Sequence, residues 1–143
     1  MAATVDNRPT SSNADAGQYG VQFMLEASVD FTVTANQLAQ NETMALFDLP
    51  ADTIVTQAFI EVETVDSDIT DVDLGCSTDG STAADLIDGA TLAATGYVTN
   101  GTYLPAGYDA AQQVVLTNKD ADTLNGAKIR VVLICFDASD RSA

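Results

Sequence analysis

The sequence predicts an all-β protein: an antiparallel β-sandwich preceded by an extended N-terminal arm. Three observations lead to this prediction. Apolar and polar residues alternate with a period of two from Tyr19 to Thr34, which is the spacing of a strand with one buried face. Residues 54–65 are rich in β-branched side chains, and residues 129–136 are apolar at nearly every position, as in buried strands. The length of 143 residues suits one domain with a substantial core.

Three segments follow from the composition. Residues 1–18 form a flexible N-terminal arm, residues 19–137 form the β-sandwich domain, and residues 138–143 form a C-terminal tail. The arm mixes Ala, Asp, Asn, Ser and Thr and holds almost nothing that a core could bury. Ordering each of its residues costs about 1–2 kcal/mol of conformational entropy. We therefore expect the arm to become ordered only where a partner supplies contacts.

The alternating run that begins at Tyr19 is longer than an ordinary strand of about 5–6 residues. We expect it to break or bend near Ala27 and Ser28, which gives either two consecutive strands or one bent strand that serves both sheets. A polar connection follows, and then a short strand at residues 43–47. The segment LPADT ends that strand, because Pro50 lacks a backbone donor and Asp52 favours a turn.

Residues 54–65 form the next expected strand, and residues 129–136 form the last. The last strand has apolar residues on both faces, which predicts a central strand covered on two sides. Residues 114–117 are its expected hairpin partner, joined through a polar loop in which Asn125 and Gly126 suit positive φ. The side chains expected in the core are Phe23, Leu25, Val29, Phe31, Ile60, Val62, Val72, Leu74, Val131 and Leu133.

Four aspartates within residues 66–73 raise the question of a calcium loop. An EF-hand needs a Gly at its sixth position and a Glu at its twelfth, but counting from Asp66 these positions hold Asp71 and Ser77. The segment is better explained as a strand with a solvated acidic face. Asp66 and Asp68, in the preceding turn, remain the better candidates for a cation site of irregular design. The expected strand has two sets of side chains: Thr70, Val72, Leu74 and Cys76 inward, and Asp71, Asp73, Gly75 and Ser77 outward.

The region that follows lacks a regular pattern. Residues 81–90 predict one helical turn capped by Ser81 or Thr82. Residues 89–113 are expected to form a long surface loop, and loops of this length are commonly functional. Its three tyrosines have two interpretations: they supply flat contact area for a partner, or they pin the loop by burying their own rings. These residues are Tyr97, Tyr103 and Tyr108.

The formal net charge of −16 is the most unusual feature of the composition. Such a surface repels phosphates, which excludes direct binding of nucleic acid. The chain has no histidine, no CxxC motif and no phosphate-binding glycine loop, and no carboxylate pair stands out from the acidic background. We therefore expect no enzyme activity, no metal site and no cofactor. The apolar runs are too short to cross a bilayer, which requires about 20 residues, so no membrane partner is expected.

Two further features bear on the compartment. The N-terminus has no basic segment followed by an apolar core, so we expect no Sec signal peptide and a protein that is kept in a cytoplasm or exported by another route. Cys76 and Cys135 both lie within apolar strand patterns. The interpretation we favour is two reduced thiols in the core, and the alternative is a disulfide between adjacent strands.

Four features occur in order along residues 45–136: a turn and strand at residues 49–62, a strand that ends in the DLG of residues 73–75, a small-residue loop with the pair Asp88-Gly89, and a closing hydrophobic strand. Together they resemble small structural proteins of tailed bacteriophages, of the capsid decoration or head-fibre kind. The resemblance implies a jelly-roll-like β-sandwich that is bound in many copies to the outside of an icosahedral head.

From this resemblance we expect a structural protein that decorates or cements the virion exterior after assembly in the host cytoplasm. Its partners would be the major capsid protein and further copies of itself, as a homotrimer. The N-terminal arm, with Arg8 and Pro9, would be the capsid-binding segment. The alternative is a secreted or surface β-sandwich that binds carbohydrate or calcium, which the aspartates and the tyrosines favour.

Overall fold

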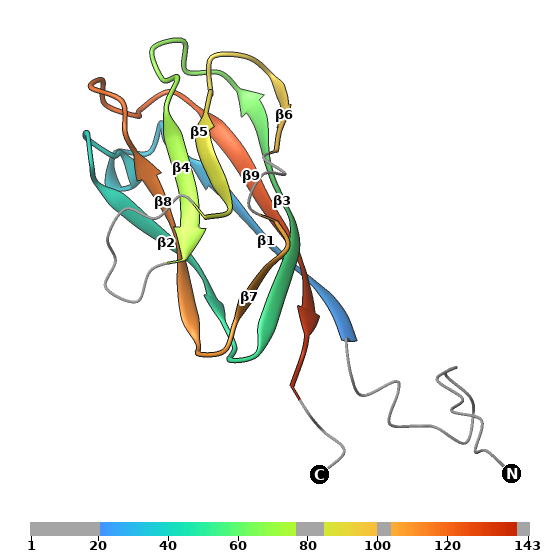
Figure 1. Cartoon of the computed structure of the whole chain (residues 1–143). Coiled ribbons are helices and arrows are strands. Elements are labelled where there is room, and N and C mark those ends of the chain that lie inside the picture. The colour runs from blue at the N-terminus through green and yellow to red at the C-terminus, as the bar shows by residue number, and fades with distance from the viewer. Residues whose placement is uncertain (1–20, 77–84, 100–103, 140–143) are drawn as a thin grey trace, which may run out of the picture.

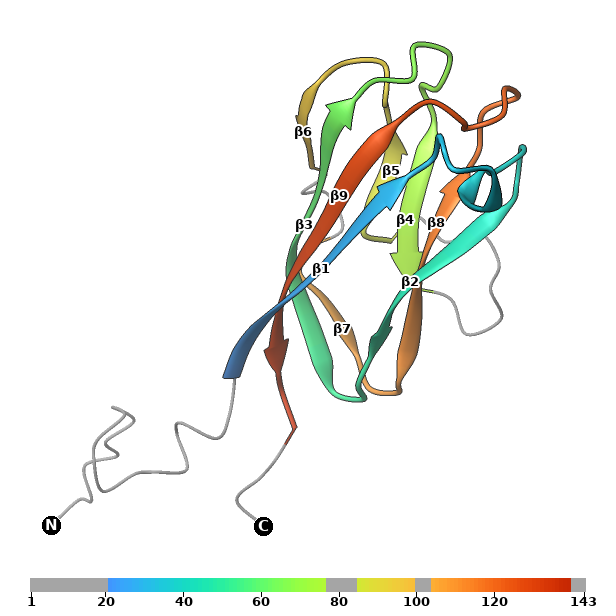
Figure 2. The ribbon, with the colours of Figure 1, turned by 180° about the vertical axis from the view of Figure 1, so that it is seen from behind.

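The computed structural model describes residues 21–76, 85–99 and 104–139, which form two antiparallel sheets packed face to face (Figure 1, Figure 2). The first sheet has the order β1-β9-β3-β6, with β7 also paired to β3, and contains β1 (Val21–Asp30), β9 (Lys128–Asp137), β3 (Thr53–Thr64), β6 (Gly96–Val98) and β7 (Ala106–Tyr108). The second sheet has the order β2-β8-β4-β5 and contains β2 (Thr43–Leu49), β8 (Gln112–Asn118), β4 (Val72–Cys76) and β5 (Ile87–Ala90). The prediction of an antiparallel β-sandwich is confirmed.

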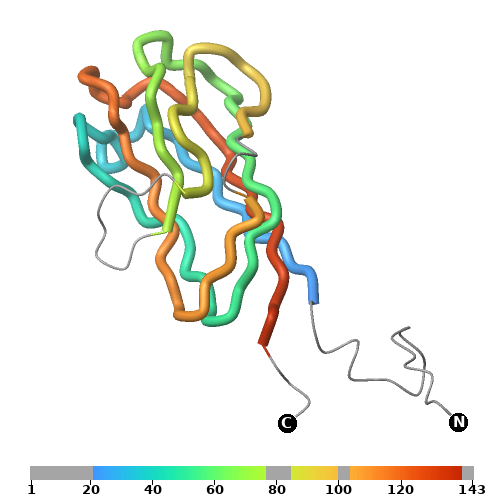
Figure 3. The backbone as a smooth tube through the Cα atoms, viewed as in Figure 1, coloured from blue at the N-terminus to red at the C-terminus, as the bar shows by residue number. Residues whose placement is uncertain are grey.

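The chain crosses repeatedly from one sheet to the other, as the backbone trace shows (Figure 3). β6 and β7 pair with different parts of β3 and together occupy one strand position at that edge. With β6 and β7 counted as one, the strand order is that of a jelly roll. The only helix in the described ranges is the 3-10 turn Thr34–Asn36, so no helix there is long enough to span a membrane.

The core fills the space between the sheets with side chains from alternate positions of each strand. Along β9, Ile129, Val131, Leu133 and Cys135 are buried, and β3 contributes Ile60 and Val62 from the neighbouring strand. Of the side chains expected in the core, all are buried except Phe23 and Leu25, which are half-buried and pack against its edge. Each fully buried aliphatic side chain contributes about 1.5–3 kcal/mol, so this alternation is the main source of stability.

The expectation for the first strand was wrong. β1 is one continuous strand that pairs with β9 alone, and it neither breaks near Ala27 nor serves both sheets. The reason is that β9 is equally long, so every residue of β1 finds a partner in it. The strand ends at Asp30, whose carboxylate accepts hydrogen bonds from the backbone and the hydroxyl of Thr32. These two hydrogen bonds lower the pKa of Asp30.

The expected hairpin between residues 114–117 and the last strand was also wrong. β8 pairs with β2 and β4 in the second sheet, whereas β9 lies between β1 and β3 in the first. β9 is therefore central, as predicted, but only its inner face is buried, and its outer side chains from Arg130 to Phe136 are half-exposed. Alternating apolar residues alone do not tell which sheet a strand joins, or what covers its second face.

Local predictions in the remaining segments had mixed outcomes. The strands expected at residues 43–47 and 54–65 are present as β2 and β3, and Asp52 adopts a φ of 59°, as a turn residue does. The helical turn expected within residues 81–90 is wrong for its second half, because Ile87–Ala90 is β5. Its first residues, 81–84, lie outside the described ranges. The expected loop at residues 89–113 contains the short strands β6 and β7.

Candidate functional site

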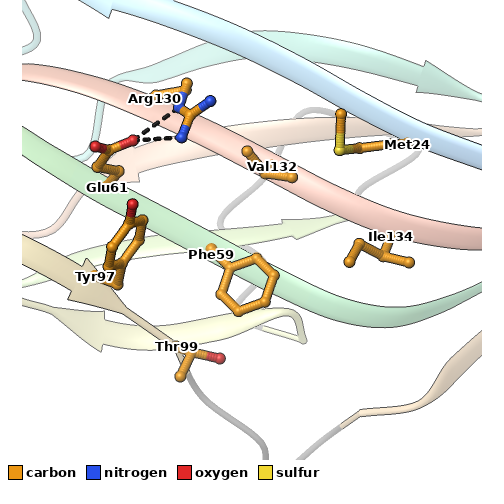
Figure 4. Close-up of a pocket in the computed structure, with 8 residues that line it drawn as sticks. All are labelled: Met24, Phe59, Glu61, Tyr97, Thr99, Arg130, Val132 and Ile134. Carbon is orange, nitrogen blue, oxygen red and sulfur yellow. Dashed lines mark hydrogen bonds and ion pairs between the residues drawn. The ribbon is translucent and has the colours of Figure 1, made fainter.

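The outer face of the first sheet carries an apolar groove of about 540 Å³, which we call the outer groove. It is formed where β1, β9, β3 and β6 lie side by side (Figure 4). In each strand the positions next to core residues point outward, so the buried Val131 and Leu133 place Val132 and Ile134 in the groove. The groove is lined by Met24, Phe59, Glu61, Tyr97, Thr99, Arg130, Val132 and Ile134.

The most exposed large apolar side chains of the described residues belong to this groove. Tyr97 is 69% exposed and Met24 is 60% exposed, and the two lie on opposite sides of it (Figure 4). A smaller hollow formed by Gln22, Phe23, Met24 and Ile134 continues the apolar surface toward the start of β1. Two of the five exposed large apolar side chains of the described residues therefore lie at this groove.

A charged cluster borders the outer groove. Arg130 Nη2 lies 2.7 Å from Glu61 Oε2, and Arg130 Nη1 lies 3.3 Å from Glu26 Oε1. The hydrogen bonds with Glu61, followed by those with Glu26, raise the pKa of Arg130. Further along the same face, Lys128 Nζ lies 3.8 Å from Asp30 Oδ2. Both cations of this face are therefore already paired with its carboxylates.

The structure gives Asp66 a structural role. Asp66 is only 8% exposed. Its Oδ2 accepts hydrogen bonds from the backbone N–H of Gly126 at 2.9 Å and from that of Asn125 at 3.2 Å. The expectation that Asn125 and Gly126 adopt positive φ was wrong. Both residues instead point their N–H groups at this carboxylate. Asp68 is exposed, and its N–H lies 3.4 Å from Asp66 Oδ1. Within the described ranges, no three Asp, Glu, His or Cys side chains are arranged to hold a metal ion.

The acidic face predicted for residues 70–77 is only partly correct. Asp71 is exposed, but Asp73 is buried to 7% exposure, and its Oδ1 accepts the N–H of Gly89 at 2.9 Å. Burial, together with the nearby charges of Asp88 and Asp71, raises the pKa of Asp73. Sequence alternation missed this because β5 packs beside β4 and covers the position. Thr70 precedes β4 and is exposed, and Ser77 lies outside the described ranges.

The predicted contact residues separate into different environments. Tyr97 is exposed on β6 at the rim of the outer groove, as a contact residue would be. Tyr108 is half-buried on β7, and its hydroxyl donates a hydrogen bond to Asp85 Oδ2, so it pins its segment instead. Tyr103, Arg8 and Pro9 lie outside the described ranges.

The two thiols are free and buried. Burial raises the pKa of Cys76 to about 12 and that of Cys135 to about 11, so neither thiol provides a nucleophilic thiolate near neutral pH. They lie on β4 and β9, in different sheets, which rules out the alternative of a disulfide between adjacent strands. Beside Cys76, Asp85 accepts the Cys76 N–H at 2.8 Å and links this core position to Tyr108.

Sequence reasoning found one residue of the outer groove, Tyr97, and missed its apolar floor. The alternation from Tyr19 to Thr34 puts Met24 on the mostly polar face of its strand, and the expectation of a last strand covered on two sides puts Val132 and Ile134 under a cover. The sequence did hold a signal for this floor. Val132 and Ile134 alternate with the core residues of the last strand, so they form a second apolar face that must contact something other than the core. Chemically, the groove offers apolar surface bordered by the paired Arg130 and Glu61 and by the hydroxyl groups of Tyr97 and Thr99, which suits binding of a largely apolar surface or ligand.

No protein-family model matches the chain, and a comparison with curated proteins gives no match. Solved structures share its fold. A chain in the capsid of Ralstonia phage GP4 is 16% identical with a TM-score of 0.65, covering 85% of this chain and 87% of that one. A chain in the acidic stable capsid of Helicobacter pylori bacteriophage KHP30 is 20% identical with a TM-score of 0.62, covering 85% and 91%. A chain in the cyanophage Pam1 capsid asymmetric unit is 17% identical with a TM-score of 0.60, covering 95% and 99%.

Proposed function

We propose that the chain is a structural protein of a tailed-phage virion that decorates or cements the outer surface of the icosahedral capsid. The observation that carries the proposal is the shared fold with chains from three phage capsids. In each pair, similar fractions of both chains are covered, from 85% to 95% of this chain and from 87% to 99% of the other. The matched chains are therefore about as long as this one, and the likeness extends over nearly the whole of each.

The chemistry of the side chains supports a structural role. The chain has no histidine, and its buried thiols have raised pKa values. The buried Asp66 and the half-buried Asp85 accept hydrogen bonds from backbone N–H groups in the fold. A net charge of −16 would keep many crowded copies soluble and apart on a capsid surface, and it opposes binding of the packaged nucleic acid.

The proposed partners are the major capsid protein and further copies of this chain, assembled as a homotrimer. The N-terminal arm, residues 1–18, would lie along the shell, with Arg8 as its only basic side chain and Pro9 lowering the entropy of an extended backbone. The sandwich would then face outward into solvent. β1 and β9 support this arrangement, because the start of β1 and the end of β9 lie at the same end of the sandwich (Figure 1).

The test is decoration of capsids that lack this protein. Purified full-length chain is mixed with such heads, and a variant without residues 2–17 is compared with it by co-sedimentation. We expect the full chain to bind in regular copies visible by electron microscopy, and the variant to bind at least ten-fold more weakly although its melting temperature is nearly unchanged. Full-length chain that fails to bind would contradict the virion role. A truncated chain that binds with undiminished affinity would contradict the arm as the anchor and leave the virion role standing.

A further inference from the structure

We propose that Asn125 is a site of spontaneous deamidation that the carboxylate of Asp66 protects. Asn followed by Gly, as at Asn125-Gly126, is prone to this reaction, because Gly has no side chain to hinder the approach of its own backbone nitrogen. The inference concerns a covalent modification within one chain, so it is independent of the virion role proposed above. It gives Asp66 a chemical role in addition to its role in stability.

The reaction needs no cofactor and no oxidant. The backbone nitrogen of Gly126 gives up its proton and attacks the side-chain Cγ of Asn125, which closes a succinimide ring. The bond from Cγ to Nδ2 breaks, and the amide nitrogen leaves with a proton as ammonia. Water then opens the ring and leaves aspartate or isoaspartate in place of Asn125. The attack therefore requires that the Gly126 N–H is released and that its nitrogen is free to move toward Cγ.

The first argument is that Asp66 holds the attacking nitrogen. Asp66 Oδ2 accepts the N–H of Gly126 at 2.9 Å and that of Asn125 at 3.2 Å, and both hydrogen bonds are partly buried. The carboxylate also packs against the Gly126 backbone, where an added Cβ would lie 3.3 Å from Oδ2. The attack must first break a hydrogen bond to a charged acceptor, which slows the reaction by about ten-fold or more.

The second argument is charge. As the proton leaves, negative charge develops on the Gly126 nitrogen, directly beside the carboxylate of Asp66 that accepts its N–H. Like charges repel more strongly in partly buried surroundings than in water. A carboxylate is also a much weaker base than an amide anion, so it does not promote the step by taking the proton. Asp66 therefore opposes the attack and does not catalyse it.

The third argument is that the backbone is fixed on both sides of this dipeptide. The N–H of Leu124 donates to Leu38 O at 2.8 Å, and the N–H of Leu38 donates to Leu124 O at 3.2 Å. On the other side, Ala127 O accepts the N–H of Phe31 at 2.9 Å. Leu124 and Ala127 are fully buried, whereas Asn125 is exposed. Protection therefore comes from the held backbone and not from burial of the reacting side chain.

The test follows deamidation of Asn125 by mass spectrometry, after the full-length chain has been incubated at mildly alkaline pH. Trypsin cuts after Lys119 and Lys128, and Asn125 is the only Asn or Gln in the peptide 120–128 that it releases. We expect folded wild type to deamidate at Asn125 about ten-fold or more slowly than wild type in denaturant. Folded Asp66→Ala should deamidate about ten-fold faster than folded wild type.

A matched control separates release of this loop from opening of the whole domain, because Asp66→Ala also lowers stability. Val55→Ala truncates a fully buried side chain opposite Cys135, at the end of β9 away from the loop. The two variants are compared at denaturant concentrations that give them equal free energies of unfolding. Val55→Ala should then deamidate within about two-fold of folded wild type, because its loss of stability leaves the Asp66 hydrogen bonds in place.

A second variant carries the test if Asp66→Ala does not fold. Asp66→Asn has nearly the same shape but no charge, so its hydrogen bond to Gly126 is weaker. It should raise the rate at Asn125 by about five-fold. Deamidation of the new Asn is counted separately, because residue 66 lies outside the peptide 120–128.

Three results would overturn the inference. Folded wild type that deamidates at Asn125 as fast as denatured wild type would show that the fold gives no protection. Asp66 variants that react no faster than folded wild type would show that the carboxylate is irrelevant, and slower reaction would show that it acts as a base. Equal acceleration in Val55→Ala and Asp66→Ala would show that the reaction proceeds through opening of the domain and not through release of Gly126.

Discussion

Replacing Asp66 by Ala should destabilise the domain through the loop between β8 and β9. The carboxylate accepts the N–H of Gly126 at 2.9 Å and that of Asn125 at 3.2 Å, and both hydrogen bonds are partly buried. A hydrogen bond to a charged acceptor contributes about 1.5–3 kcal/mol, and a partly buried donor that loses its acceptor recovers some of this from water. We therefore expect a loss of about 2 kcal/mol.

The assay is thermal unfolding followed by circular dichroism, in calcium and in EDTA. For a chain of this size the melting temperature changes by about 4 °C per kcal/mol, so Asp66→Ala should melt about 8 °C below the wild type. Asp68→Ala is the matched control, because Asp68 is exposed and donates only its backbone N–H to Asp66, which alanine keeps. The control should change stability by less than about 0.5 kcal/mol.

Calcium separates this explanation from the alternative of a cation site. A ligand that binds only the folded state stabilises it by about 2.7 kcal/mol at a hundred times its dissociation constant. If Asp66 serves as an acceptor for backbone donors, calcium and EDTA should give the same melting temperature for wild type and for both variants. A calcium-dependent rise in the wild type that both variants abolish would refute the reasoning and identify a metal site.

Three further predictions follow from individual side chains. Burial raises the pKa of Asp73 above its value in the unfolded chain. Ionisation of Asp73 therefore costs stability at pH 7, whereas at about pH 3 the carboxyl group is protonated in both states and costs nothing. Asp73→Asn should raise the melting temperature at pH 7 and leave it unchanged at about pH 3. Cys76 and Cys135 should resist a thiol reagent at pH 8 in the native state and react fully in denaturant, since burial raises both pKa values; rapid native labelling would show that the core opens. Tyr108→Phe should cost about 1 kcal/mol in chemical denaturation by removing the hydrogen bond to Asp85, and an unchanged midpoint would contradict its pinning role.

The sequence predicts the class of fold well because alternation is a local property. Val29, Val62 and Leu74 could be assigned to the core from their own neighbours, since successive side chains of a strand point to opposite faces. Which strands pair is a property of distant segments. β8 and β9 are close in the sequence but belong to different sheets, and no local pattern distinguishes this crossing from a hairpin.

The candidate site was harder to predict for the same reason. Tyr97 was identified because an aromatic residue stands out in a small-residue segment. Met24 was not, because alternation places it on the outward face without showing which strands lie beside it to form the groove. Asp73 is the opposite case. A carboxylate side chain is expected to be exposed to solvent, but β5 lies beside Asp73 and buries it, and a hydrogen bond from the N–H of Gly89 compensates for the burial. In both cases the deciding contact comes from another strand.

Acidity and an exposed apolar face have opposite effects on how copies of one protein meet. At physiological salt, charges are screened beyond about 8 Å, so the net charge of −16 keeps copies apart only when their surfaces come near contact. At that distance the outcome depends on which faces meet. Most orientations bring uncompensated carboxylates together, whereas on the outer face of the first sheet Lys128 and Arg130 compensate part of the charge of Asp30, Glu26 and Glu61. Repulsion between copies is therefore weakest where cations stand beside the carboxylates, which is how an acidic surface can favour some contacts over others.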